Sequence, residues 1–260
     1  MIEIKSNKIN CLSDSNLFPV PPIELRFMQE TESLFIEIGD GLVSQLKAIA
    51  GLKSDSSLVD IGSGYGRLAH ALLRAGFSGK YHGMEILKRQ VTWCQENLSM
   101  GQIKFSHLDV YNSRYNPSGS IPADRIKLDQ LTDQSDLIVL TSVFTHMLAT
   151  DIENYIDCCS RMLLSGGCVC ATFFLLNEQR RTLIEKKQSR LPLPFQLTNF
   201  SLYHNEKDPL HAIAFDESWV VDVIQSKGME LKQIHHGFWC DGDLTNTSQY
   251  QDFVIFCKKD

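Results

Sequence analysis

Apolar residues along the chain occur in two patterns: short continuous runs, and segments in which they recur every three or four positions. Five strands are predicted, at residues 58–61, 80–84, 103–107, 137–140 and 168–174, of which 137–140 is fully apolar. Helical spacing follows the first, second and fourth runs, at about 68–73, 87–98 and 150–165. Strands that alternate with helices of this length predict a largely parallel sheet with helices on both faces, which is an α/β fold.

The predicted helix after the fourth strand carries signals for both of its ends. Thr150 and Glu153 have the spacing of a capping box, in which the two side chains satisfy free N–H groups of the first turn. Gly166 and Gly167 predict the end of this helix, directly before the fifth strand.

The alternating pattern breaks after residue 176. About forty residues pass before the next clear helix, at 217–227, and strands are predicted at 230–234 and 253–257. Only the loop 239–251 joins these two strands, so we expect them to be antiparallel. Residues 175–214 leave the carboxyl end of the fifth strand, and long loops in compact domains are often lids or substrate loops. We therefore expect 175–214 to be a lid or substrate insert.

The composition is that of an ordinary globular protein. The chain has 260 residues, 43% hydrophobic and 22% charged, with a formal net charge of −6, which argues against disorder and against a dedicated nucleic-acid binder. Residues 1–52 are expected to form an N-terminal helical extension and 53–260 the main domain. No apolar run approaches the roughly 18 residues of a membrane span, and no secretory signal is recognisable. A cytoplasmic location is the expectation.

The eight cysteines contain no C-x-x-C pair, which excludes zinc-ribbon and thioredoxin-like sites. Several lie in apolar segments, so reduced, buried thiols are expected. His235 and His236 are neighbours on a predicted strand and point to opposite faces, so they do not readily share a metal ion. No metal site is predicted.

A glycine-rich loop follows the first strand, with Gly62, Gly64 and Gly66 ahead of a helix. Such a loop lets a ligand approach the backbone and the free N–H groups of the helix. The dinucleotide pattern G-x-G-x-x-G is broken by Arg67 at its third position. Asp60, two residues before the loop, suits a positively charged amino group better than a pyrophosphate. Taken alone, the loop is equally compatible with an ordinary strand–turn–helix connection.

Carboxylates also end the next two strands. Glu85 follows the loop by about twenty residues, where a carboxylate can accept hydrogen bonds from ribose hydroxyls. Asp109 ends the third strand beside the apolar Val110, a pairing that suits an adenine amino group and ring face. These features occur in the right order at the ends of successive strands.

With these motifs, the sequence resembles the class I S-adenosylmethionine-dependent methyltransferases. The resemblance is carried by VDIGSGYGR at 59–67, Glu85, Asp109, the fourth-strand block DLIVLTSVFTH at 136–146, and RMLLSGG at 161–167. It covers about 57–174 and 215–257. It implies a Rossmann-like sheet of seven mostly parallel strands, with the last strand antiparallel and inserted between the fifth and sixth. The implied cofactor is S-adenosylmethionine.

The resemblance also implies cofactor contacts. Asp60 and Gly62 hold the methionine amino end, and Glu85 takes the ribose hydroxyls. Asp109 takes the adenine amine, and the stretch from Ser142 to His146 passes beneath the reactive end. Arg67 either reaches the methionine carboxylate or packs between helices. The expected cofactor-binding residues are Asp60, Gly62, Ser63, Gly64, Arg67, Glu85, Asp109, Val110 and Ser142.

The expected reaction is methyl transfer to a hydroxyl of a small or medium-sized molecule. The segment after the fourth strand lacks the Asn-Pro-Pro-Tyr or Asp-Pro-Pro-Tyr of many enzymes that methylate nucleobase amines. A hydroxyl usually needs a general base, for which His146 is the first candidate and His211 the second. Three alternatives stay open: a cofactor-binding protein without catalysis, an NAD-dependent oxidoreductase, and a methyltransferase that acts on an amine or on nucleic acid.

The insert carries a run of basic residues: Arg180, Arg181, Lys186, Lys187 and Arg190. Such a run usually forms a solvated helix face. Attraction of a phosphate- or carboxylate-bearing substrate is the functional alternative.

Overall fold

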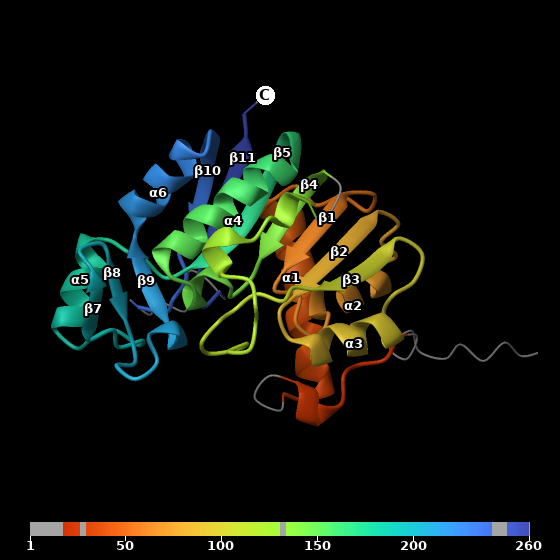
Figure 1. The fold of residues 1–260 in the computed structure, drawn as a ribbon, viewed down its shortest axis with the longest axis horizontal. Helices are drawn as coiled ribbons and strands as arrows, with labels where there is room; N and C mark the ends of the chain where they lie inside the picture. Colours follow the sequence, from red (N-terminus) through yellow and green to blue (C-terminus); the bar gives the residue numbers. More distant parts are fainter. Residues whose placement is uncertain (1–17, 27–29, 131–133, 241–248, 260) are drawn as a thin grey trace, which may run out of the picture.

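The computed structural model describes residues 18–26, 30–130, 134–240 and 249–259. Its main sheet has seven strands in the order β10-β11-β5-β4-β1-β2-β3. Their bounds are β1 (Ser57–Ile61), β2 (Lys80–Glu85), β3 (Ile103–His107), β4 (Ser135–Leu140), β5 (Leu163–Phe173), β10 (Met229–His235) and β11 (Asp252–Lys258). β11 pairs antiparallel with both β5 and β10, while β1 to β5 pair in parallel. The predicted Rossmann-like topology is therefore confirmed (Figure 1).

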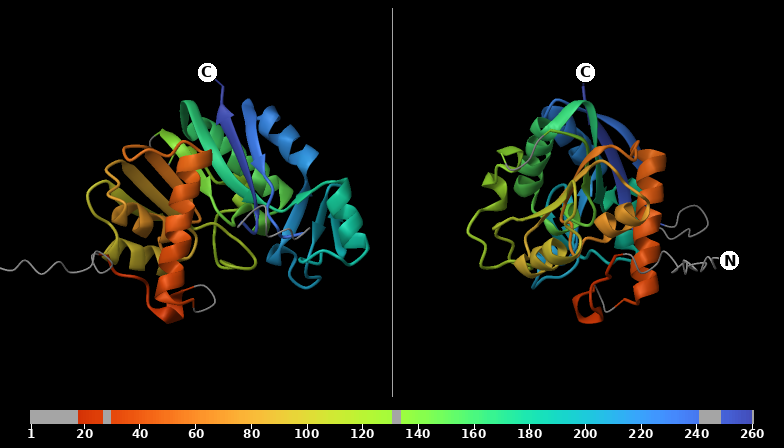
Figure 2. Two further views of the ribbon diagram at one scale, coloured as in Figure 1. Left: turned by 180° about the vertical axis from the view of Figure 1, so that it is seen from behind. Right: turned by 90° about the vertical axis from the view of Figure 1, so that its right-hand side faces the viewer.

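Helices cover both faces of this sheet, as Figures 1 and 2 show from opposite sides. One face carries α1 (Glu32–Ile49), α2 (Arg67–Arg74) and α3 (Lys88–Asn97), and the other carries α4 (Ala149–Met162) and α6 (Glu217–Ser226). Alternate residues of one strand enter different cores: in β4, Leu137 and Val139 pack toward α1 and α2, whereas Ile138 and Leu140 pack toward α4. Burial on both sides explains why the central strand β4 is apolar from Leu137 to Leu140.

The insert after β5 forms a small sheet with one helix. Its sheet has the order β6-β9-β8-β7, and it lies beside α6 in Figure 1. The elements are β6 (Leu175–Leu176), α5 (Glu178–Glu185), β7 (Phe195–Thr198), β8 (Ser201–Tyr203), the 3-10 helix η7 (Pro209–His211) and β9 (Ile213–Asp216). The expectation that about forty residues pass between residue 176 and the next clear helix was wrong, because α5 begins at an N-cap: Asn177 Oδ1 accepts from the Arg180 amide at 3.0 Å.

Two predicted boundaries around α4 were also wrong. The helix begins at Ala149, and the Asp151 carboxylate accepts from the Leu148 amide at 3.3 Å, so the acid of the N-terminal cap is Asp151 rather than Glu153. At the other end the helix stops at Met162, and β5 begins directly at Leu163. Gly166 and Gly167 lie inside β5, in the irregular stretch between Leu163 and Cys168, which both pair with β4.

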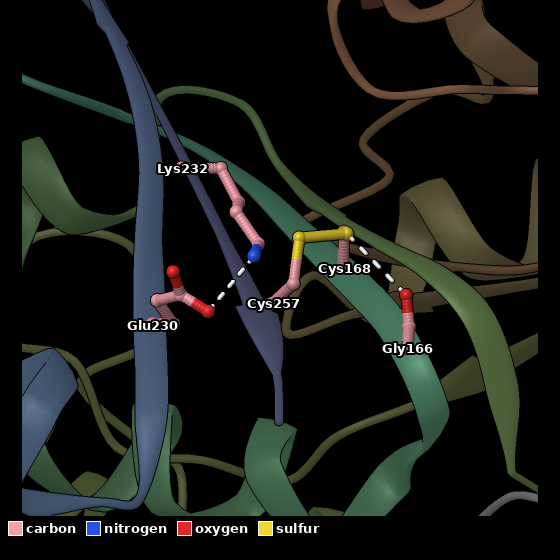
Figure 3. Close-up of a disulfide and its surroundings, with 5 residues drawn as sticks. All are labelled: Gly166, Cys168, Glu230, Lys232 and Cys257. Atoms are coloured by element: carbon pink, nitrogen blue, oxygen red, sulfur yellow. Dashed lines mark hydrogen bonds and ion pairs between the residues drawn. A yellow bond between two sulfur atoms is a disulfide. The ribbon is translucent and has the colours of Figure 1, made fainter. Parts of the chain in front are cut away.

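A disulfide joins Cys168 of β5 to Cys257 of β11 (Figure 3). The two are register partners of the antiparallel pair, with Cα atoms 4.0 Å apart, so the topology brings them together across 89 residues of sequence. This corrects the expectation of reduced thiols for these two residues. The free cysteines of the described chain are all buried: Cys94, Cys158, Cys159, Cys170 and Cys240. Cys11 lies outside the described residues, and the cytoplasmic location stays a prediction.

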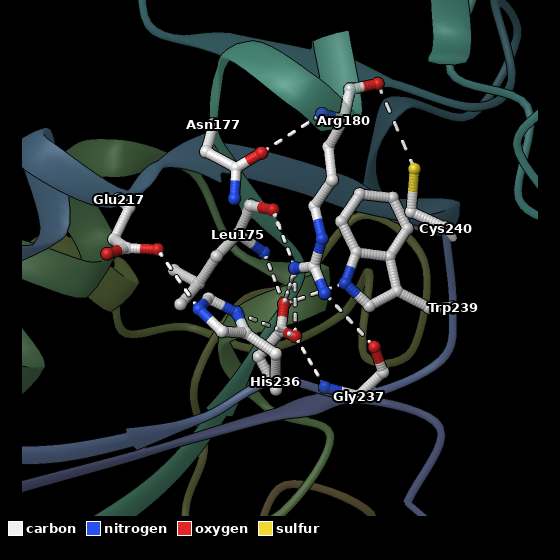
Figure 4. Close-up of polar contacts among 9 residues, drawn as sticks. Leu175, Asn177, Arg180, Glu217, His236, Gly237, Trp239 and Cys240 are labelled. Carbon is white, nitrogen blue, oxygen red and sulfur yellow. Dashed lines mark hydrogen bonds and ion pairs between the residues drawn. The ribbon is translucent and has the colours of Figure 1, made fainter. Parts of the chain in front are cut away.

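A buried carboxylate, Asp252, joins the insert to the main sheet (Figure 4). Arg180 of α5, itself 1% exposed, donates to both oxygens of Asp252 at 2.9 Å. The Trp239 indole and the backbone amides of Leu175 and Gly237 donate to the same carboxylate, each at 2.7 Å. Arg181 pairs with Asp216. These two arginines hold the insert in place. They therefore neither form a solvated helix face nor attract a phosphate- or carboxylate-bearing substrate.

Within the described ranges, no helix has both the length and the apolar character needed to cross a membrane.

Candidate functional site

An open cleft of about 790 Å³ lies at the carboxyl ends of β1, β2 and β4. Ligands of parallel α/β sheets bind at this end of the strands. The walls come from the ends of these strands, the start of α3 and the segment that follows β3. The predicted site residues that line the cleft are Gly62, Glu85, Val110, Ser142 and His146.

The glycine loop needs its glycines for space as well as for conformation. Gly62 has a φ of +79°, and a Cβ atom there would lie 2.5 Å from the Val143 Cγ2 atom. Gly66, with a φ of +73°, is the N-cap of α2, and a Cβ atom there would lie 2.6 Å from the Leu98 Cδ1 atom. The loop can therefore sit this close to Val143, across the cleft wall, only with glycine at position 62.

Glu85 holds the glycine loop and the start of α3 in a fixed relation. Its Oε2 atom accepts from the Gly64 amide at 3.0 Å, and Oε1 accepts from the Leu87 amide at 2.8 Å. The side chain lines the cleft and is buried, which raises the pKa of its carboxyl group. A carboxylate has about four lone-pair sites, so Glu85 can still accept bonds from a ligand.

Asp60 lies behind the loop and is not part of the cleft wall. It is 4% exposed, and the Tyr81 hydroxyl donates to its Oδ2 atom at 2.6 Å. Burial raises the pKa of Asp60 to about 7, although the Tyr81 hydrogen bond opposes this shift; the nearby charge of Glu85 adds to it. Asp60 is therefore easily protonated near neutral pH.

Asp60→Asn should raise the free energy of unfolding of the cofactor-free protein at pH 8 by at least about 1 kcal/mol, the equivalent of one pKa unit. Because its pKa is raised on folding, Asp60 stabilises the fold fully only below its unfolded pKa, and this stability is lost as the pH rises through about 7. Asparagine can still accept from Tyr81 but carries no charge. Urea denaturation from pH 5 to pH 8 should show the advantage of the variant growing with pH, and equal stability at pH 8 would contradict it.

Other predicted cofactor residues also lie outside the cleft wall. Arg67 forms an ion pair with Glu30 of the N-terminal segment and lies 5.4 Å from the Phe35 ring centroid, so its guanidinium packs against α1. Asp109 is exposed and accepts a hydrogen bond from Ser120, whereas its neighbour Val110 does line the cleft. The predicted residues outside the wall are Asp60, Ser63, Gly64, Arg67, Asp109 and His211.

His146 lines the cleft at the end of the 3-10 helix η6 (Phe144–His146). Its Nδ1 atom lies 2.9 Å from the Leu210 carbonyl oxygen of the insert. A carbonyl oxygen can only accept, so Nδ1 carries the proton and Nε2 of the neutral ring can accept one. Burial lowers the pKa of His146, and the nearby Arg114 charge lowers it further. The imidazole is therefore neutral around pH 7.

Sequence reasoning missed the surroundings of His146. The Tyr115 ring contacts the imidazole edge-on, with centroids 5.4 Å apart, and the Asn112 side chain donates to the His146 carbonyl at 3.3 Å. Arg114 forms an ion pair with Asp208, which precedes η7. The loop after β3 and the insert therefore meet at His146. No motif marks these contacts, because they join segments far apart in sequence.

The described residues fit S-adenosylmethionine. The buried hydroxyl of Thr141, in the cleft wall, has no hydrogen-bond partner within the described chain. An unpaired buried hydroxyl is costly, and the polar methionine end would satisfy it. Glu85 offers acceptors for the ribose, and the apolar side chains of Leu108 and Val110 offer a surface for the adenine ring.

Comparison with known proteins agrees with this site. Residues 59–171 match the family model described as a methyltransferase domain. The magnesium protoporphyrin IX methyltransferase of Synechocystis PCC 6803, solved with bound SAH, is 18% identical with a TM-score of 0.52, over 90% of this chain and 88% of that one. A putative O-methyltransferase of Nostoc punctiforme PCC 73102 is 13% identical with a TM-score of 0.55, over 86% of this chain and 56% of that one.

A third similar structure is the 1,6-didemethyltoxoflavin-N1-methyltransferase of Burkholderia thailandensis, bound to 1,6-didemethyltoxoflavin and S-adenosylhomocysteine. It is 12% identical with a TM-score of 0.53, over 88% of this chain and 80% of that one. At these identities the structural matches establish the fold, and the family model adds the activity. Residues 59–171 therefore form a methyltransferase domain on the fold of the class I S-adenosylmethionine-dependent methyltransferases, with S-adenosylmethionine as its cofactor.

Proposed function

We propose that this methyltransferase acts on a hydroxyl group of a small or medium-sized molecule, with His146 as the general base. The observation that carries the proposal is the Leu210 carbonyl bound to His146 Nδ1, because it leaves Nε2 as the proton acceptor at the cleft wall. Two of the similar structures are methyltransferases of magnesium protoporphyrin IX and of 1,6-didemethyltoxoflavin, and a third is a putative O-methyltransferase, which supports a small-molecule acceptor.

The cofactor supplies an electrophilic methyl group on its sulfonium. His146 Nε2 takes the hydroxyl proton as the acceptor oxygen attacks, which general bases do best when their pKa lies near the working pH. The neighbouring Tyr115 and Asn112 orient the acceptor and His146, and closure of the cleft by the insert excludes water. Correct in-line positioning provides the remainder of the rate increase.

We assign the cofactor contacts by position in the cleft. Glu85 holds the ribose hydroxyls, Val110 packs on the adenine, and Ser142 lies beneath the reactive end. Gly62 admits the methionine end, and Thr141 Oγ1 is a donor for it, while the contact from Ser63 stays a prediction. The roles of Asp60, Gly64 and Asp109 stay predictions, while Arg67 is assigned to helix packing because Glu30 occupies its guanidinium.

The insert 175–214 is proposed to control which acceptor enters. It supplies the Leu210 carbonyl that orients His146, and Asp208 ties it to Arg114 of the loop after β3. The insert therefore contacts the cleft wall at His146, although none of its own residues lines the cleft. The N-terminal extension 1–52 contributes α1 to the face of the sheet that also carries α2 and α3.

The test is an acceptor panel assayed for S-adenosylhomocysteine release and for the methylated product by mass spectrometry. Matched compounds should carry a hydroxyl, an aliphatic amine or a nucleobase amine on similar small scaffolds. We expect turnover with hydroxyl compounds and none with the nucleobases. Turnover confined to amines would refute the hydroxyl assignment. Cofactor binding without turnover on any compound would favour a non-catalytic cofactor-binding protein.

A further inference from the structure

We propose that Thr172 and Gln251 are positioning residues that hold Ser142 in a left-handed backbone conformation and thereby shape the reactive end of the cleft. Neither residue lines the cleft. The inference rests on the proposed function only where it concerns His146. The effect of Thr172 and Gln251 on cofactor affinity can be measured without an acceptor.

Ser142, Thr172 and Gln251 form a closed ring of three hydrogen bonds. The Ser142 amide donates to Thr172 Oγ1 at 2.7 Å. The Thr172 hydroxyl then donates to Gln251 Oε1 at 2.6 Å, and the Ser142 hydroxyl donates to the same oxygen at 3.0 Å. The directions follow because an amide N–H can only donate and an amide oxygen can only accept. Three segments meet in this ring: the end of β4, β5, and the residue before β11.

The ring surrounds a strained residue. Ser142 has a φ of +57°, a region that side chains with a Cβ atom disfavour. Among the described residues other than glycine, positive φ occurs only at Ser142 and Lys187. A residue keeps such a conformation when surrounding contacts impose it, and such residues cluster at functional sites. The bonds from Thr172 and Gln251 are the contacts that impose it here.

The conformation of Ser142 determines where the next residues lie. Val143 follows it and lies so close to the glycine loop that a Cβ atom at Gly62 would be 2.5 Å from Val143 Cγ2. The helix η6 then begins, and the His146 amide donates to the Val143 carbonyl at 3.0 Å. A change at Ser142 would therefore displace both the wall opposite Gly62 and the proposed base.

The test is a set of double-mutant cycles that use Ser142→Gly. Glycine adopts positive φ without strain, so it removes the need for the ring. Thr172→Val and Gln251→Leu should each weaken S-adenosylhomocysteine binding about tenfold when Ser142 is present, a change of about 1.4 kcal/mol. In the Ser142→Gly background the same two changes should weaken binding less than about threefold. Calorimetry measures all of the affinities.

The controls separate positioning from general stability. Thr172→Ser keeps the hydroxyl and should restore the affinity lost in Thr172→Val, whereas Thr92→Val, at an exposed position of α3, should have no effect in either background. Equal losses in the two Ser142 backgrounds would overturn the proposal, and so would unchanged affinity in both Thr172→Val and Gln251→Leu. Gln251 is only partly buried, so its variant remains informative if Thr172→Val folds poorly. If no hydroxyl compound of the acceptor panel is methylated while the coupling of Ser142 to Thr172 and Gln251 is still measured, only the proposed function is refuted.

Discussion

His146→Gln is expected to lower turnover by about 10²- to 10⁴-fold, the usual contribution of a positioned general base. Glutamine has a similar reach but takes no proton near neutral pH. Cofactor affinity should stay within about twofold, because His146 lies at the acceptor end of the cleft. Turnover and calorimetry on the same preparation give both quantities.

The pH dependence provides an independent check on His146. Its pKa lies below the ordinary value of 6.5 because the ring is buried, and only the neutral ring can accept a proton. Turnover should therefore rise with pH through a pKa below 6.5 and then level off, and this acid limb should disappear in His146→Gln. His211→Gln is the matched comparison, since His211 lies next to Leu210 but not in the cleft wall. A large loss in His211→Gln, with His146→Gln unaffected, would reassign the base.

Asp252→Ala is expected to lower the free energy of unfolding by about 3–5 kcal/mol, the range for breaking a buried ion pair by removing one partner. The change leaves the Arg180 guanidinium, 1% exposed, without its carboxylate, and it also leaves the Trp239 indole and two backbone amides without their acceptor. Urea denaturation measures the loss.

A surface ion pair supplies the control for Asp252. Glu230 and Lys232 lie 2.8 Å apart with side chains 53% and 49% exposed, and Figure 3 shows them beside the disulfide. Exposed ion pairs contribute little to stability because water and salt screen them, so Glu230→Ala should have a small effect. A loss in Asp252→Ala no larger than that in Glu230→Ala would show that the buried pair does not hold the insert in place.

The centre of the sheet could be predicted because its strands are buried on both sides. The predicted range 137–140 lies within β4 for this reason, since Leu137 to Leu140 are all buried and apolar. The prediction failed where distant contacts override a local signal. Gly166 and Gly167 have the sequence of a helix end, yet the helix already stops at Met162, because Leu163 pairs with Ser135 of β4. Likewise α5 is held by Arg180 and Asp252, which are 72 residues apart in sequence.

The candidate site also contains residues that the sequence could predict and residues that it could not. Gly62, Glu85 and Val110 could be predicted because a strand end and its following loop are contiguous in sequence, and all three line the cleft. Leu210 and Gln251 could not, because a backbone carbonyl carries no sequence signal and Gln251 reaches Ser142 only after β11 pairs beside β5. The disulfide depends on that same pairing, which makes Cys168 and Cys257 neighbours.

The disulfide has a consequence for the whole carboxyl-terminal part of the chain. It closes a covalent ring that contains the entire insert, α6 and β10. A protease cut at any one bond within this ring leaves a single covalent molecule, and the two new ends remain at the high effective concentration of a tethered pair. One cut in the insert 175–214 therefore does not separate it from the rest of the protein. Only reduction of the disulfide then removes the covalent link.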